Sequence, residues 1–145
     1  MAMKTSWYIV QVVFASIGGF IAWFLGGIDG YIYALAVFVI ADFITGFMRS
    51  VVERRMSSRL GSRAIFRKVL IFLLIGLSNM VDIYLLLDFG IFRTAVVFFY
   101  ISNEGISILE NAHAIGLPIP AKLKLIMEQL RGDEPNIKNR KKGRK

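Results

Sequence analysis

Three carboxylic acids lie inside otherwise apolar segments of the sequence, at Asp42, Asp82 and Glu104. Each segment is about as long as one membrane-spanning helix, so each acid would lie where lipid is the solvent. An ionisable side chain in that position is costly and is expected to face protein or water rather than hydrocarbon. The three acids therefore indicate an aqueous path or a polar seam between subunits. The alternative is a static hydrogen-bonded network within one helical bundle, with some acids protonated.

Other polar residues share helical faces with these acids. Residues three, four or seven positions apart lie on one face of a helix, so Asp42 aligns with Thr45 and Asp82 aligns with Asn79. The last apolar segment carries a polar stripe along most of its length. The candidates for an intramembrane polar core, a pore lining or an assembly site are Asp42, Thr45, Asn79, Asp82, Arg93, Tyr100, Asn103, Glu104, Ser107, Glu110 and Asn111.

The residue patterns of enzymes and metal sites are missing from the sequence. There is no cysteine, so no disulfide, thiolate ligand or thiol nucleophile can form. The one histidine, His113, has a single acidic neighbour at helical spacing, Glu110, which is too few ligands for a metal. No G-x-S-x-G, Walker A or H-E-x-x-H motif is present. We therefore expect no catalytic, metal-binding or cofactor-binding residues.

Four apolar segments are expected to cross a membrane, at about residues 5–28, 30–48, 69–87 and 89–112. The first has no acidic or basic residue, and as a helix it would be about 36 Å long, against a hydrocarbon core of about 30 Å. That length also argues against a cleaved signal peptide. We predict an all-α, polytopic membrane protein in which residues 1–117 form a transmembrane helical domain.

The basic residues fall on one side of this arrangement. The net charge is +8 although 56% of the residues are hydrophobic. Basic residues concentrate in a loop expected at 49–68 and again after residue 118, whereas Arg93 lies near the opposite side. Under the positive-inside rule, four crossings place both termini and the basic loop in the cytoplasm. A three-crossing arrangement, which would translocate the N-terminus or the basic tail, is the alternative.

Residues 118–145 are expected to form a cytoplasmic region with two parts. Residues 121–130 place their apolar side chains on one face of a short amphipathic helix, which suits the inner membrane surface or a partner subunit. Six of the eight residues from 138 to 145 are basic, so this polybasic tail and the basic loop are expected to bind anionic lipid headgroups. Nucleic acid is not expected as a partner, because no aromatic residues are interleaved with the basic ones.

The first apolar segment also carries a stripe of small residues on one helical face. Small side chains allow the close backbone approach that drives helix association in lipid. The stripe therefore predicts either a contact within a homo-oligomer or packing inside one subunit, and the sequence does not separate the two. Its members are Gln11, Ala15, Gly19, Ala22 and Gly26.

The sequence resembles the phage holin family, in particular holins of the toxin-secretion and phage-lysis type. The resemblance runs from about residue 39 to 130, and Ala64 stands where the family pattern has glycine. Its most specific part is an N-E-x-x-S-I-L-E-N block within 100–111 that is followed by G-L-P-I-P. The other matching elements are Asp42-Phe43-Ile44-Thr45-Gly46, Ser57-Ser58, Gly61, Arg67-Lys68 and Arg93.

The resemblance implies a multi-pass protein of the bacterial cytoplasmic membrane that self-associates into lesions. Such lesions release a cell-wall-degrading endolysin or, in some relatives, a protein toxin. Polar stripes that pack together in small assemblies could line water in large ones. Intramembrane acids also suit a small ion or solute transporter or channel, although no inverted repeat is visible in the sequence. A non-permeating membrane scaffold is the third hypothesis.

Overall fold

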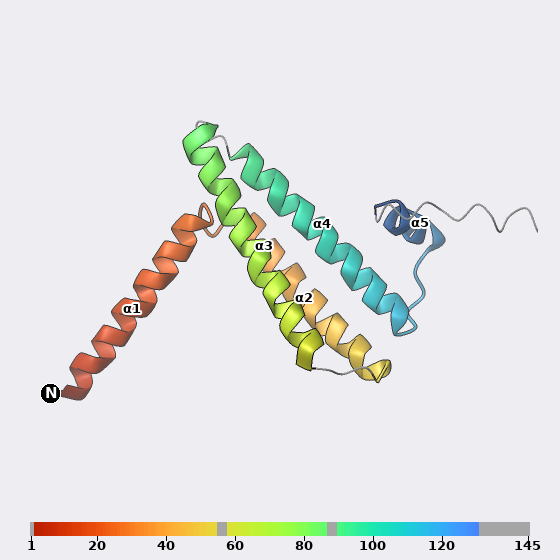
Figure 1. Ribbon diagram of the computed structural model, residues 1–145, viewed down its shortest axis with the longest axis horizontal. Coiled ribbons are helices and arrows are strands. Elements are labelled where there is room, and N and C mark those ends of the chain that lie inside the picture. The colour runs from red at the N-terminus through yellow and green to blue at the C-terminus, as the bar shows by residue number, and fades with distance from the viewer. Residues whose placement is uncertain (1, 55–57, 87–89, 131–145) are drawn as a thin grey trace, which may run out of the picture.

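The computed structural model describes residues 2–54, 58–86 and 90–130, which form five α-helices (Figure 1). Within the described part of the chain, α4 packs on both α2 and α3 to form a three-helix bundle. The polybasic segment 138–145 lies outside the described residues. The helices are α1 (Ala2–Phe24), α2 (Gly30–Val52), α3 (Ser58–Leu85), α4 (Ile91–Ala114) and α5 (Ala121–Leu130).

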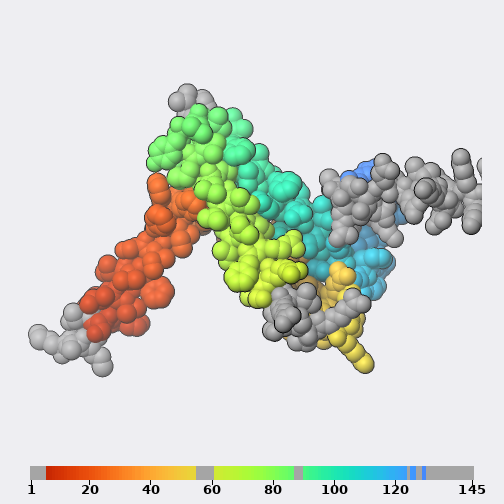
Figure 2. Space-filling model, viewed as in Figure 1, coloured from red at the N-terminus to blue at the C-terminus, as the bar shows by residue number. Residues whose placement is uncertain are grey.

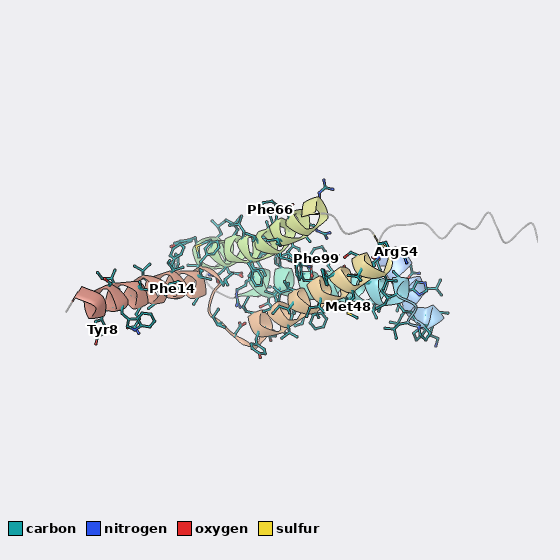
Figure 3. All side chains as sticks on the ribbon, turned by 90° about the horizontal axis from the view of Figure 1, so that it is seen from below. Tyr8, Phe14, Met48, Arg54, Phe66 and Phe99 are labelled. Atoms are coloured by element: carbon teal, nitrogen blue, oxygen red, sulfur yellow. The ribbon has the colours of Figure 1, made fainter. Side chains whose placement is uncertain are left out.

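The first helix, α1, leaves the bundle at an open angle and meets it only near its own C-terminal end (Figures 1 and 2). The side chains of residues 6–21 are exposed in the single chain, and those of Tyr8 and Phe14 point into open space (Figure 3). The contact with α3 is made by Phe24, whose ring lies over Gly76. A Cβ atom at position 76 would lie 1.9 Å from that ring, so this crossing requires glycine.

The ends of the helices follow from local sequence. Gly26 and Gly27 terminate α1 with φ values of +78° and +97°, which glycine adopts without strain. Asp29 then caps α2, because its Oδ1 accepts a hydrogen bond from the backbone N–H of Ile32 at 2.9 Å. The helix expected over residues 5–28 therefore ends earlier than predicted, at Phe24, because the glycine turn stops it.

The basic segment 49–68, for which the sequence predicts a loop, is largely helical. The second helix continues to Val52, and the third begins at Ser58. Arginine, lysine and leucine favour helix and no proline interrupts the segment, which agrees with its helical ends. As a consequence, Lys68 lies well inside a long helix rather than in a loop.

The buried apolar core occupies one part of the bundle. It is formed by the first half of α2, the middle of α3 and the start of α4, with one residue from the α1–α2 turn. In the second halves of α2 and α4, the described residues with buried side chains or buried contacts are polar. The apolar core consists of Leu25, Ile32, Leu35, Val39, Ile71, Ile75 and Val97.

Three of the described helices are long and apolar enough to cross a membrane. The stretches are Ser6–Phe24, Gly30–Val52 and Gly61–Leu85. The fourth helix is 24 residues long, but polar and charged side chains such as Arg93 and Glu104 lower its mean hydropathy, so it is not in this group. The regular structure of the described residues is therefore all helical, with three helices that could span a membrane.

Candidate functional site

The polar residues separate into two clusters at opposite ends of the three-helix bundle. Lys68 and Asp82 mark these ends on α3, and the 14 positions between them correspond to about 21 Å along a helix. The first cluster, called the Lys68 cluster, consists of Asp42, Thr45, Lys68, Glu104 and Asn111. The second, called the Arg93 cluster, consists of Asp29, Asn79, Asp82 and Arg93, with backbone carbonyl groups of the α1–α2 connection. The three acids Asp42, Asp82 and Glu104 therefore form no continuous line.

In the Lys68 cluster, one ammonium group bridges carboxylates on two other helices. Lys68 Nζ on α3 donates a hydrogen bond to Oδ2 of Asp42 on α2 at 2.6 Å, and another to Oε2 of Glu104 on α4. Asn111 Nδ2 donates to Oδ1 of Asp42 at 3.2 Å and to Oγ1 of Thr45 at 3.3 Å. The side chain of Lys68 on α3 therefore forms ion pairs with both α2 and α4.

The charges of the Lys68 cluster do not balance when all three groups are ionised. The side chains of Lys68, Asp42 and Glu104 are 15%, 13% and 2% exposed, so water screens them little. Two carboxylates then face one ammonium. A buried charge that loses its partner is strongly destabilising, so the closed arrangement of this cluster depends on Lys68.

In the Arg93 cluster, one guanidinium group binds the connection between α1 and α2. Arg93 Nη1 donates to Oδ2 of Asp29 at 2.8 Å, while Nε and Nη2 donate to the carbonyl oxygens of Leu25 at 2.5 Å and Gly27 at 3.2 Å. Asn79 Nδ2 of α3 donates to the carbonyl of Phe24 at 3.2 Å. Carbonyl groups at a helix C-terminus lack intrahelical partners. The side chains of Arg93 and Asn79 donate hydrogen bonds to such carbonyl groups here.

The two acids of the Arg93 cluster, Asp82 and Asp29, accept hydrogen bonds from different donors. Asp82, which is fully buried, accepts hydrogen bonds from the backbone N–H groups of Phe92 at 3.0 Å and of Arg93 at 2.6 Å, at the N-terminus of α4. The helix dipole favours a negative charge at that end. The hydrogen bond from Arg93 holds the pKa of the Asp29 carboxyl below its ordinary value.

The remaining members of the predicted stripe on α4 do not form one buried face. Tyr100 is half-buried, and its ring meets that of Phe99 edge-on with centroids 5.2 Å apart. Ser107 and Glu110 are half-buried. Asn103 is exposed in the single chain and lies outside both clusters. The polar stripe of the sequence is therefore wider than the polar seam of the bundle.

Two cluster residues were missed by the sequence analysis, which selected neither Lys68 nor Asp29. A signal for Lys68 was present, because Lys68, Ile75 and Asp82 are spaced by seven residues and lie on one face of α3. A signal for Asp29 was its place immediately before the apolar run that begins at Gly30, which is typical of an N-cap.

The small-residue stripe of α1 is divided by the structure. Gln11, Ala15 and Gly19 are exposed and Ala22 is half-buried. Gly26, however, lies in the turn beyond the helix, where a Cβ atom would be 2.3 Å from Oδ1 of Asn79. Gly26 therefore serves a contact inside the subunit and does not extend the helical face, whereas a Cβ atom at Gly19 would meet nothing within 4 Å.

Comparison with known proteins identifies the family of the chain that carries these clusters. The profile of the bacteriophage holin family matches residues 19–132. This chain belongs to the bacteriophage holin family. A probable holin of Bacillus phage phi105 is 38% identical to it over 98 residues, which are 68% of this chain and 72% of the phage protein. No solved structure matches the chain.

Two bacterial relatives are similar over a larger share of their length. An uncharacterised 14.9 kDa protein of Clostridium perfringens is 42% identical over 117 residues, which cover 79% of this chain and 87% of that protein. An uncharacterised protein of Listeria innocua is 33% identical over 129 residues, which cover 87% and 91% of the two chains. Both polar clusters fall within the match to the holin family, whereas most of α1 lies before it.

Proposed function

We propose that this holin-family protein crosses the bacterial cytoplasmic membrane four times, self-associates there and opens lesions that release an endolysin or a toxin. The observation that carries the proposal is the family match, which spans the whole three-helix bundle. The probable holin of a Bacillus phage among its relatives agrees with this role. The span-capable helices α1, α2 and α3 supply the membrane setting.

The pairing of its charges supports α4 as the fourth crossing. Arg93 and Glu104 reduce the hydropathy of α4, but both are buried and partnered inside the bundle, at 7% and 2% exposure. A paired and buried charge no longer faces hydrocarbon, so the cost that an isolated α4 would incur is greatly reduced. The 24 residues of α4 also match the 23 residues of α2, against which it packs.

The proposed orientation places both termini in the cytoplasm. The exposed cations Arg54, Arg63 and Arg67 lie at the end of the bundle that contains the α2–α3 connection. With α5 and the following basic residues on the same side, they would meet anionic lipid headgroups, at roughly 1 kcal/mol per basic residue near the surface. Homo-oligomer formation is part of the proposal, with residues Gln11, Ala15, Gly19 and Ala22 of α1 as candidates for the contact between copies.

The test is regulated expression of the chain in a bacterium together with a folded cytoplasmic reporter enzyme. A holin is expected to accumulate without harm and then to collapse the membrane potential abruptly and release the reporter. A transporter or a small channel would change ion gradients without releasing a folded enzyme. Cells that keep growing with an intact potential, despite high levels of the protein in the membrane, would contradict permeabilisation and favour a scaffold.

A further inference from the structure

In a single chain the polar groups of the Lys68 cluster face one another, whereas a water-filled lesion needs polar groups that face outward. Every buried side-chain nitrogen and oxygen in the described residues has a hydrogen-bond partner. In the closed bundle the polar atoms of the Lys68 cluster are therefore paired with one another rather than with water. A change within the bundle is needed before Asp42, Thr45, Glu104 and Asn111 can meet solvent.

We infer that Lys68 is the latch of this bundle: its ammonium group holds the first half of α3 against α2 and α4, and its departure opens the polar face beneath it to water. The consequence for lesion timing rests on the proposed holin function. The opening itself is a property of the three-helix bundle and can be measured separately.

The described part of the first half of α3 buries little apolar surface. Among residues 61–70, all described side chains are exposed except those of Ala64 and Lys68, which are half-buried (Figure 3 shows Phe66 pointing outward). The apolar core on α3 begins only at Ile71. Burial of apolar surface therefore secures the second half of α3, whereas Lys68 in the first half contributes ion pairs to both α2 and α4.

The chemistry of the cluster suits release at this point. Lysine carries its charge on a flexible stem with four carbon atoms, and such a side chain can bring its ammonium group to the membrane surface. Lys68 lies close to the end of the bundle at which Arg63 and Arg67 are exposed. After its departure, the two carboxylates and the Asn111 amide remain together on α2 and α4, where water can hydrate them.

The absence of cysteine from the sequence allows a direct accessibility test in the full-length protein. The reporter is Ser107→Cys, which lies on α4 between Glu104 and Asn111 and is half-buried. A thiol-specific maleimide reacts with the thiolate, which forms readily only where water reaches the sulfur. The control reporter is Ser102→Cys, which is already exposed on α4 in the closed bundle.

Each reporter is placed in four backgrounds: the parent chain, Lys68→Met, Arg67→Met and Asp42→Asn. With Lys68→Met, we expect labelling of the thiol at position 107 to become several-fold faster and the lag before membrane collapse to shorten. Arg67→Met is the matched control, since it removes an adjacent but exposed positive charge, and it should leave both measurements unchanged. Labelling at position 102 should be the same in all four backgrounds.

Asp42→Asn tests the opposite direction. It leaves one carboxylate for one ammonium, so it should slow labelling at position 107 and lengthen the lag. If Lys68→Met accumulates and labels no faster than Arg67→Met, the latch is refuted. If Lys68→Met does not accumulate, unchanged or faster labelling with Asp42→Asn refutes it instead. Failure of the parent chain to permeabilise cells would refute the holin role alone, because the labelling comparison would still stand.

Discussion

The two polar clusters contain the same set of charges but compensate them differently. Each has two carboxylic acids and one basic side chain. In the Arg93 cluster, Asp82 binds backbone N–H groups of α4, and the guanidinium of Arg93 binds two carbonyl groups as well as Asp29. In the Lys68 cluster, one ammonium group is the charged partner of both acids, and Asp42 also accepts a hydrogen bond from Asn111.

Under the proposed latch, this difference predicts which end of the bundle opens. The partners in the Arg93 cluster are largely backbone groups, which are fixed once the helices have formed. Arginine also presents its donors in a planar fork, whereas lysine is a point charge on a flexible stem. We therefore expect the Arg93 cluster to stay closed and the end that contains the Lys68 cluster to open.

The largest expected effect is that of removing the guanidinium at the fixed end. Arg93→Met leaves the carbonyl groups of Leu25 and Gly27 without their donor, and an unsatisfied buried polar group costs about 1–3 kcal/mol. The lost pair with Asp29 adds less, because that side chain is 39% exposed. We expect a large fall in melting temperature of the detergent-solubilised protein, together with rapid proteolysis in the membrane. Arg93→Lys should give an intermediate loss, since it keeps the charge but not the fork. If Arg93→Met lowered the melting temperature less than Lys68→Met, the Arg93 cluster would not be the more stable of the two clusters.

A smaller effect is expected from the acid that caps α4. Asp82→Ala removes the acceptor for two backbone N–H groups, and loss of a helix cap costs about 0.5–2 kcal/mol. Hydrogen exchange of the Phe92 and Arg93 amides should accelerate, while the amides around Glu104 keep their parent rates. Asp82→Asn retains one acceptor oxygen and should change exchange less. Equal acceleration at both sites would indicate that the two clusters are not independent.

The smallest effect is a dependence on pH at Asp29. Its folded pKa is below the ordinary value, so the ionised carboxylate contributes stability at pH values above about 3.9, and this contribution is lost as the pH falls through the folded pKa. The parent protein should therefore lose thermal stability on acidification in this range, and Asp29→Asn should lose less. Because the Asp29 side chain is 39% exposed, the difference should be small. Identical pH profiles for the two proteins would show that the Arg93–Asp29 pair does not contribute to stability.

Much of the fold was predictable, because each signal for it is local. Hydropathy placed the apolar segments, although the first helix ends at Phe24, at a glycine turn, and not at residue 28 as expected. The basic segment 49–68, expected as a cytoplasmic loop, is largely helical, because charge marks topology and says little about secondary structure. The helical content of this segment placed Lys68 on the same face of α3 as Ile75 and Asp82.

The sequence by itself determined that this chain forms long apolar helices with acids on particular faces, since hydropathy and helical periodicity are properties of one segment. Only the tertiary structure decided that Asp42 and Glu104 share Lys68, while Asp82 caps α4 some 21 Å away along α3. The physical reason is that periodicity fixes the direction of a side chain around its own helix. The rotation and longitudinal shift of one helix against another depend instead on packing between residues that are distant in the sequence.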